Sequence, residues 1–201
     1  MTFKASCLAA VAFAASVFAG GAQASIVNGS FEADLQAAGT WSNYANLTGW
    51  TGGSGGIELR NNVAGTAYDG VNYVELDTYQ NSMASQAVTT TGAHYTLTFA
   101  YSPRMNVPSS SNGIQVWWNG SLLDTVTGTG SSTGNNWVLY TYDVLGTSPS
   151  SLLRFIAVGT SDSLGGSLDA VSLAQVPEPA TLLLIGLGMV GVAAGRKRKQ
   201  A

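Results

Sequence analysis

The central part of the sequence predicts an all-β fold, an antiparallel β-sandwich. Residues 94–101 (HYTLTFAY) alternate between large apolar residues and smaller ones, which is typical of a half-buried strand. Clusters of glycine, asparagine and serine recur at intervals of about 8–12 residues, the spacing of strands in a sandwich. No stretch keeps the helical period of about 3.6 residues.

The expected strands follow one another along the chain. Asn119-Gly120 lies between two apolar runs and predicts a hairpin over 113–126, because both turn residues tolerate positive φ. The glycine-rich segments 51–56 and 127–136 are predicted to be flexible loops at the rim of the sandwich. The other expected strands are 57–59, 73–76, 83–88, 94–101, 137–144, 152–158 and 168–173.

The first 24 residues have the pattern of a secretory signal peptide. Lys4 precedes an apolar run that closes on Ala22-Gln23-Ala24, so cleavage is expected between Ala24 and Ser25. The only cysteine, Cys7, lies inside this segment. The mature domain, residues 25–175, would therefore have no disulfide and would depend on its core, with the help of a metal ion if one binds.

The last segment, residues 176–201, predicts transient residence in a membrane. Pro177-Glu178-Pro179 precedes an apolar segment at 180–195, which is near the lower length limit for a membrane-spanning helix. Four consecutive basic residues follow at 196–199 and would stay on the cytoplasmic side. The apolar segment is thus predicted to be a short hydrophobic sorting helix that delivers the domain outside the cell.

The charge balance of the domain excludes one class of partner. Residues 25–176 contain three arginines, no lysine and ten acidic residues, a formal net charge of −7. Without a basic patch to neutralise phosphates, we expect no nucleic-acid binding.

Short motifs at both ends of the domain resemble the galactose-binding-like domains and related carbohydrate-binding modules. The matches are Asn28, Gly29, Phe31 and Glu32 near the start, Leu168, Asp169, Val171 and Leu173 near the end, and residues 73–77 and 99–104 between them. The resemblance implies an antiparallel jelly-roll β-sandwich with its first and last strands adjacent. It also implies that Glu32 and Asp169 coordinate a structural Ca²⁺, a cation that prefers oxygen ligands. Alternatively, both carboxylates are solvated at strand ends.

The C-terminal segment closely resembles the PEP-CTERM sorting signal. Val176-Pro177-Glu178-Pro179 matches the motif, followed by the apolar segment and the basic end. The resemblance implies a Gram-negative bacterium, processing by an exosortase near Pro177, Glu178 and Pro179, and a location at the cell surface or in an extracellular matrix rich in exopolysaccharide. An ordinary C-terminal membrane anchor is the alternative.

Aromatic and polar residues on the domain could bind a carbohydrate. Trp117 and Trp118 are adjacent on a strand and must face opposite sides. Alternation with Ile114 and Val116 places Trp118 in the core and Trp117 outward, where it would form a platform for a sugar ring. The predicted ligand-binding residues are Trp117, Gln115, Arg60, Arg104, Tyr68 and Tyr79. Alternatively, most of these aromatic residues fill the core.

These observations predict a non-catalytic protein that binds extracellular polysaccharide. A structural or adhesive matrix protein without a defined glycan ligand is the first alternative. A small glycan-active enzyme is the weaker one, since Glu58 and Glu75 could form a catalytic pair only if they faced each other at about 5–9.5 Å. The sequence does not show that they do, and we expect no enzyme.

Overall fold

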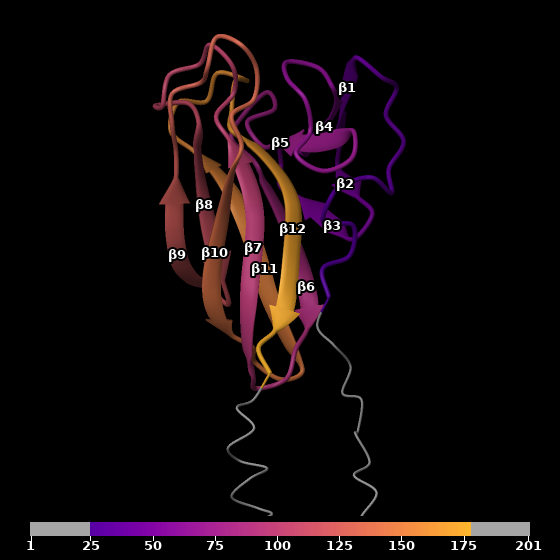
Figure 1. The fold of residues 1–201 in the computed structure, drawn as a ribbon, viewed down its shortest axis with the longest axis vertical. Helices are drawn as coiled ribbons and strands as arrows, with labels where there is room; N and C mark the ends of the chain where they lie inside the picture. The colour runs from indigo at the N-terminus through magenta and orange to yellow at the C-terminus, as the bar shows by residue number, and fades with distance from the viewer. Residues whose placement is uncertain (1–24, 178–201) are drawn as a thin grey trace, which may run out of the picture.

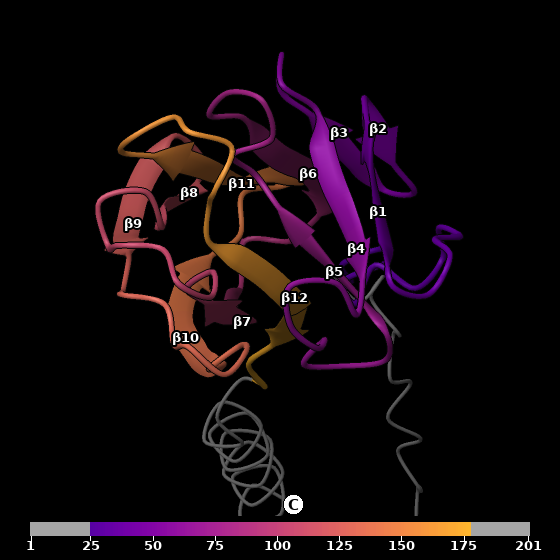
Figure 2. The same cartoon turned by 90° about the horizontal axis from the view of Figure 1, so that it is seen from above.

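A computed structural model describes residues 25–177 as twelve β-strands in two six-stranded sheets (Figure 1). Seen from above, β12, β7 and β10 lie in one layer and β8, β11 and β6 in the other (Figure 2). The predicted antiparallel jelly-roll β-sandwich is confirmed. Within residues 25–177, no helix is long and apolar enough to cross a membrane.

The predictions for the two ends of the chain fall largely outside the described residues. Ser25 and Pro177 are described, whereas Ala24, Glu178, Pro179 and the apolar segment 180–195 are not. The boundaries of the signal peptide and of the sorting segment therefore stay predictions.

The first sheet has the order β1-β4-β5-β12-β7-β10, with every neighbouring pair antiparallel. β12, the last strand, lies between β5 and β7 in the middle of this sheet. Its strands are β1 (Thr40–Tyr44), β4 (Ile57–Asn61), β5 (Asn72–Glu75), β12 (Ser167–Gln175), β7 (His94–Ser102) and β10 (Val138–Leu145).

The second sheet has the order β2-β3-β6-β11-β8-β9 and is also antiparallel throughout. The hairpin of β8 and β9 turns at Asn119 and Gly120, whose φ angles are 49° and 81°, as the turn requires. The strands are β2 (Asn46–Leu47), β3 (Trp50–Gly52), β6 (Met83–Thr89), β11 (Ser150–Val158), β8 (Gly113–Trp118) and β9 (Ser121–Val126).

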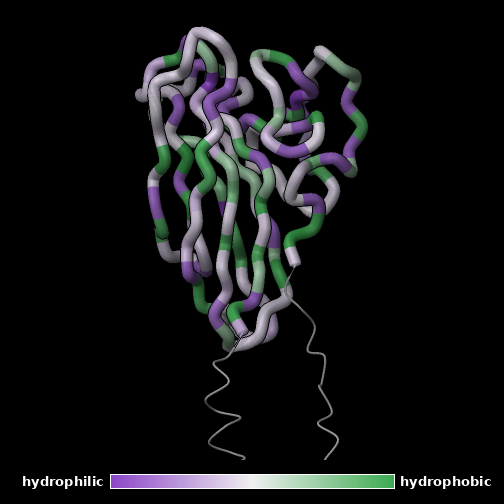
Figure 3. Tube along the Cα trace, viewed as in Figure 1, coloured by the Kyte–Doolittle hydropathy of each residue, from purple (hydrophilic) through white to green (hydrophobic). Residues whose placement is uncertain are grey.

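Every strand expected from the sequence is present, with ends that differ by at most two residues. Hydrophobic and hydrophilic residues alternate along the long strands (Figure 3). Three strands, β1 to β3, are absent from the prediction. They are short, and β1 is polar and mostly exposed, so it lacks the apolar alternation that marks a half-buried strand.

The NGSFE motif is not a strand, which corrects one expectation drawn from the resemblance. The Asn28 side chain donates to Asp34 Oδ2 (2.8 Å) and accepts from the Ala33 N–H (3.0 Å). Such local side-chain bonds compete with strand pairing. The motif nevertheless lies beside the last strand, because the Val171 N–H donates to the Gly29 carbonyl at 2.9 Å.

A chain of aromatic rings joins the two layers of the core. Phe31 packs on Trp50 with ring centroids 5.6 Å apart, and Trp50 packs on Phe155 at 6.2 Å. Phe155 in β11 then meets Phe99 in β7 edge-on at 5.0 Å. All four rings are at most 2% exposed, and such ring pairs add stability beyond the burial of their area.

Backbone hydrogen bonds occur in both glycine-rich segments, whose flexibility stays a prediction. Gly53 and Gly56 form an isolated bridge, and the Gly56 N–H donates to the Gly53 carbonyl at 2.9 Å. In the second segment the Gly130 N–H donates to the Val107 carbonyl at 2.9 Å. The loops after β7, β9 and β11 gather at the upper end of the sandwich in Figure 1, whereas both ends of the coloured ribbon lie toward its lower end.

Candidate ligand-binding site

Charged residues lie on the outer face of the first sheet. Alternation along β4 directs Ile57 and Leu59 into the core and Glu58 and Arg60 to the opposite face. Yet Glu58 is only 4% exposed and Arg60 only 3%. Since charged residues are seldom buried unless they are paired, this face must be covered and its charges compensated.

The register of the sheet aligns the residues of this face. Glu58 on β4 lies opposite Glu75 on β5. At the sheet edge, β1 places Asn43 opposite Glu58 and Trp41 opposite Arg60. The face therefore brings a carboxylate pair, a guanidinium group and an edge tryptophan together.

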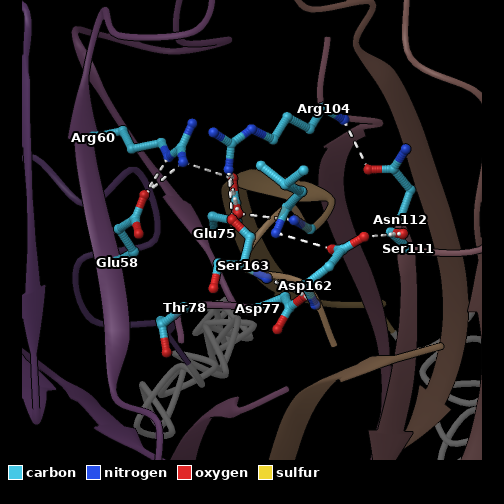
Figure 4. A network of polar contacts seen from close by, with 12 residues as sticks. Glu58, Arg60, Glu75, Asp77, Thr78, Arg104, Ser111, Asn112, Asp162 and Ser163 are labelled. Carbon is cyan, nitrogen blue, oxygen red and sulfur yellow. Dashed lines mark hydrogen bonds and ion pairs between the residues drawn. The ribbon is translucent and has the colours of Figure 1, made fainter. Parts of the chain in front are cut away.

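Two arginines compensate the two carboxylates (Figure 4). Arg60 Nη2 lies 2.6 Å from Glu58 Oε1 and 2.9 Å from Glu75 Oε2, so one guanidinium bridges both acids. Arg104 Nη1 lies 2.9 and 3.2 Å from the two Glu75 oxygens. The Gly165 N–H also donates to Glu75 Oε1 at 2.8 Å. Both oxygens of Glu75 are thus occupied.

Burial determines the protonation of Glu75. Its side chain is 0% exposed, and this loss of solvation raises its pKa to about 7, against the opposing attraction of Arg60 and Arg104. The carboxyl group can therefore take up a proton near neutral pH.

Two loops are pinned over the charged face. The Arg104 N–H donates to Oδ1 of the buried Asn112 at 3.0 Å, and Arg104 Nη1 donates to the Ser163 carbonyl at 2.9 Å. Asp77, also fully buried, accepts from the N–H groups of Asp162 (3.0 Å) and Ser163 (3.1 Å). Nε and Nη2 of Arg104 make no hydrogen bond to residues 25–177, and the side chain is 19% exposed.

Above these charges lies a pocket of about 330 Å³, here called the arginine pocket. Two aromatic residues at its rim are largely exposed, Trp41 at 55% and Tyr79 at 66%. The Tyr79 hydroxyl donates to the Ser54 carbonyl at 2.8 Å, which fixes the ring despite its exposure. The pocket is lined by Trp41, Asn43, Glu58, Arg60, Thr78, Tyr79, Arg104 and Ser163.

The structure brings half of the predicted ligand-binding residues together. Arg60, Arg104 and Tyr79 all line the arginine pocket. Five further lining residues are not among the predicted ligand-binding residues: Trp41, Asn43, Glu58, Thr78 and Ser163. In residues 73–77 (YVELD), Glu75 and Asp77 alternate with core residues. This alternation indicates from the sequence that the two acidic side chains point away from the core.

Trp117 and Gln115 lie on β8 in the second sheet, so they cannot share a site with Arg60 and Arg104. The orientation predicted for the tryptophan pair is confirmed, with Trp118 buried and Trp117 half-buried on the outer face. Trp117 Nε1 donates to Gln115 Oε1 at 3.1 Å, and the Arg154 guanidinium lies 5.9 Å from its ring centroid.

Tyr68 lies in a third region, apart from the arginine pocket and from Trp117. Its ring packs edge-on against Trp137, with centroids 6.3 Å apart. Its N–H donates to Asp169 Oδ2 at 2.8 Å. Tyr68 therefore lies beside the residues predicted to hold a metal ion, and the six predicted residues do not form one site.

Glu32 and Asp169 contact the same short segment, Tyr68 to Asn72, which leads into β5. Glu32 Oε1 accepts from the N–H groups of Val71 (2.8 Å) and Asn72 (2.6 Å), while Asp169 Oδ2 accepts from those of Tyr68 and Asp69. Asp169 is fully buried, which raises its pKa to about 7. Among residues 25–177, no group of three or more histidine, cysteine or acidic side chains has the arrangement of a metal site.

Comparison with known protein families identifies a motif at the C-terminal end of the chain. Residues 175–199 match the family model described as the PEP-CTERM protein-sorting motif. The chain carries a PEP-CTERM sorting motif. This motif indicates an exported protein whose membrane-anchored precursor is processed by an exosortase, as the resemblance implied. No curated protein matches this chain.

Solved structures resemble the domain in front of the PEP-CTERM motif. The Stig cyclase Fisc from Fischerella sp. TAU has a TM-score of 0.58 at 16% identity, over 78% of this chain and 98% of the cyclase. The K1 cleaved adhesin domain of Lys-gingipain from Porphyromonas gingivalis W83 has a TM-score of 0.51 at 15% identity, over 69% and 98%. A family 35 carbohydrate binding module from Clostridium thermocellum reaches only 0.43 at 15% identity, over 67% and 97%.

These similarities show the fold alone. The sandwich occurs in a cyclase and in an adhesin domain, so catalysis cannot be inferred from it in either direction.

Proposed function

We propose that residues 25–175 form a non-catalytic carbohydrate-binding domain, and that the arginine pocket holds the sugar. The observation that carries this proposal is the pair of exposed aromatic rings, Trp41 and Tyr79, beside a charged floor. The C–H faces of sugar rings stack on aromatic side chains, while a few polar groups bind the hydroxyls. A pocket of about 330 Å³ accommodates a short stretch of a glycan chain.

The polar groups of the pocket match the needs of sugar hydroxyls. Arg104 presents two nitrogens without partners in the described chain, and Oε2 of Glu58 makes no hydrogen bond to residues 25–177. Asn43 adds an exposed amide at the rim. Donors and acceptors side by side suit adjacent hydroxyls, each of which can donate and accept.

The same geometry argues against glycoside hydrolysis. Glu58 and Glu75 do face each other, but Arg60 lies between them and contacts both. A glycosidase needs one carboxyl to protonate the leaving group and another to act as base or nucleophile. Glu75 is fully buried with both oxygens bound, so we assign it the role of positioning the two arginines.

We further propose that the ligand is an exopolysaccharide at the surface or in the extracellular matrix of a Gram-negative bacterium. The strands that carry Trp41 and Arg60, β1 and β4, lie near the upper end of the sandwich in Figure 1, and the last strand, β12, runs toward the lower end. While the precursor is anchored, the pocket would point away from the membrane and toward the matrix. Exosortase would be its processing partner.

A glycan array with the purified domain tests the proposal. We expect specific binding to one class of matrix polysaccharide, with competition by the soluble oligosaccharide. If no glycan binds, the alternative of a structural or adhesive matrix protein without a glycan ligand is correct.

We also propose that Glu32 and Asp169 hold a structural Ca²⁺. The donors fit this ion: both side chains are carboxylates, and Oδ1 of Asn72 is buried without a hydrogen-bond partner. Asn72 is oriented by its amide group, which donates to the Phe31 carbonyl at 3.0 Å. A cation here would compensate the buried Asp169 and join the start of the domain to its last strand.

Calcium should therefore raise the thermal midpoint. We expect an increase of about 5–10 °C between EGTA and saturating Ca²⁺, since ligand binding to the folded state alone contributes a few kcal/mol to a domain of this size. In the Glu32→Gln variant the increase in the thermal midpoint should shrink to less than half, because the replacement removes one ligand charge. Glu32 is exposed, so the replacement should not disturb the core. A matched Asp143→Asn variant on β10 should keep the full increase. Equal midpoints with EGTA and with Ca²⁺ would exclude the site.

A further inference from the structure

A second, smaller pocket adjoins the arginine pocket. Its volume is about 190 Å³, and it is lined by Tyr44, Ala45, the turn 53–56, Asn43 and Tyr79. We call it the glycine pocket. Asn43 and Tyr79 line both pockets, so these two residues form the partition between them.

The partition is rigid. The Tyr79 hydroxyl donates to the Ser54 carbonyl (2.8 Å), and Asn43 Nδ2 donates to the Gly55 carbonyl (2.7 Å). Thr78 Oγ1 donates to that same Gly55 carbonyl at 2.7 Å. Three side chains from β1 and the turn after β5 are therefore bonded to one backbone turn. An aromatic ring held at its tip loses little conformational freedom when a ligand binds, which favours binding.

The second half of the turn, Gly55 and Gly56, must be free of side chains. A Cβ atom at Gly55 would lie 2.8 Å from Thr78 Oγ1, and one at Gly56, where φ is +79°, would lie 2.5 Å from Asn43 Oδ1. Glycine is thus required at both positions. As a result the glycine pocket has a floor of bare backbone, to which a ring can approach closely.

We propose that the two pockets are successive subsites for one extended polysaccharide chain, with the Tyr79 ring between them. This inference rests on the proposed function and specifies its ligand class: internal stretches of a polymer, as opposed to single sugars or chain ends. The arginine pocket binds one stretch through charged groups, and the glycine pocket binds the neighbouring stretch against backbone and Tyr79. A site for a single terminal sugar would need only the first pocket.

The chain-length dependence of binding tests this inference. Isothermal titration calorimetry would use the cello-, manno- and xylo-oligosaccharide series, from monosaccharide to hexasaccharide. In the series that binds, we expect the affinity to rise at least about tenfold between the monosaccharide and the longer members. A constant affinity along the series would overturn the inference and leave the proposed function intact.

A variant whose new side chain fills only the glycine pocket tests directly whether this pocket is a subsite. Ala45 is exposed and lines this pocket but not the other. We expect Ala45→Trp to abolish the gain from chain length and leave monosaccharide affinity within about twofold of the original. Ser54→Trp, in the turn, should do the same and serves if the first variant does not fold.

The matched control is Ala174→Trp, at an exposed position near the end of β12 and outside both pockets. It should keep the full chain-length dependence. If Ala45→Trp and Ser54→Trp keep it as well, the glycine pocket is not a subsite. Absence of binding at every length, together with absence of binding on the glycan array, would instead refute the proposed function and, with it, this inference.

Discussion

Replacement of Arg60 by methionine is expected to lower the free energy of unfolding by about 3–5 kcal/mol at pH 8. Arg60 is 3% exposed and is the one cation that contacts both Glu58 and Glu75 within residues 25–177. Without it, two buried carboxylates face each other with only Arg104 nearby. Removal of one partner from a buried ion pair leaves an uncompensated charge, which costs far more than the pair contributed. Urea denaturation followed by tryptophan fluorescence measures the change.

The loss should be smaller at about pH 5. Burial has already raised the pKa of Glu75 to about 7 from an ordinary value of 4.5, and loss of Arg60 removes an attraction that lowers it. Between these pH values the folded protein holds a proton that the unfolded chain has released. The free energy of unfolding therefore falls as the pH rises through this window, and it should fall more steeply in Arg60→Met than in the original protein.

An exposed ion pair provides the control. His94 and Asp143 lie 2.6 Å apart, but their side chains are 62% and 67% exposed. Asp143→Asn should change the free energy of unfolding by less than about 0.5 kcal/mol. A loss below about 1 kcal/mol for Arg60→Met at pH 8 would show that the charged floor is not a preorganised part of the fold.

Replacement of Trp41 by alanine is expected to weaken glycan binding by about 10- to 100-fold. Burial of a large aromatic face against a sugar is worth about 1.5–3 kcal/mol, and each 1.4 kcal/mol corresponds to a tenfold change in affinity. Because Trp41 is 55% exposed on the edge strand β1, the variant should fold normally. Calorimetric titration with the best oligosaccharide from the array measures the effect.

Trp117→Ala is the matched control for this loss. Trp117 lies on the outer face of the second sheet, away from the arginine pocket. Its replacement should change the affinity by less than about twofold. If Trp117→Ala abolishes binding and Trp41→Ala does not, the ligand binds on the other sheet and the arginine pocket has no part in it.

The sequence predicts the sheets well because their signal is local. In residues 57–61 and 73–77, apolar and charged residues alternate, so the strands and the outward direction of Glu58, Arg60 and Glu75 can be read directly. The burial of these charges could not be predicted in this way. It depends on loops after β7 and β11, which are distant in the sequence and are held by Asn112 and Asp77.

The tryptophan of the site was missed for a related reason. Trp117 lies in a strand with regular apolar alternation, which predicts that its ring points outward and favours it as a sugar platform. Trp41 lies in a short polar strand without such a pattern, and its position beside Arg60 follows only from the pairing of β1 with β4. A sugar platform is defined by its neighbours, and here those neighbours come from separate segments.

The indole N–H signals in a two-dimensional NMR spectrum test the central claim most directly. The chain has five tryptophans, all within the described residues, and those at 50, 117, 118 and 137 each donate a hydrogen bond to a protein oxygen. The Trp41 indole makes none with residues 25–177. On addition of the oligosaccharide selected by the array, we predict that the Trp41 signal shifts and the Trp117 signal does not. A shift of the Trp117 signal with an unchanged Trp41 signal would contradict the arginine pocket as the glycan site.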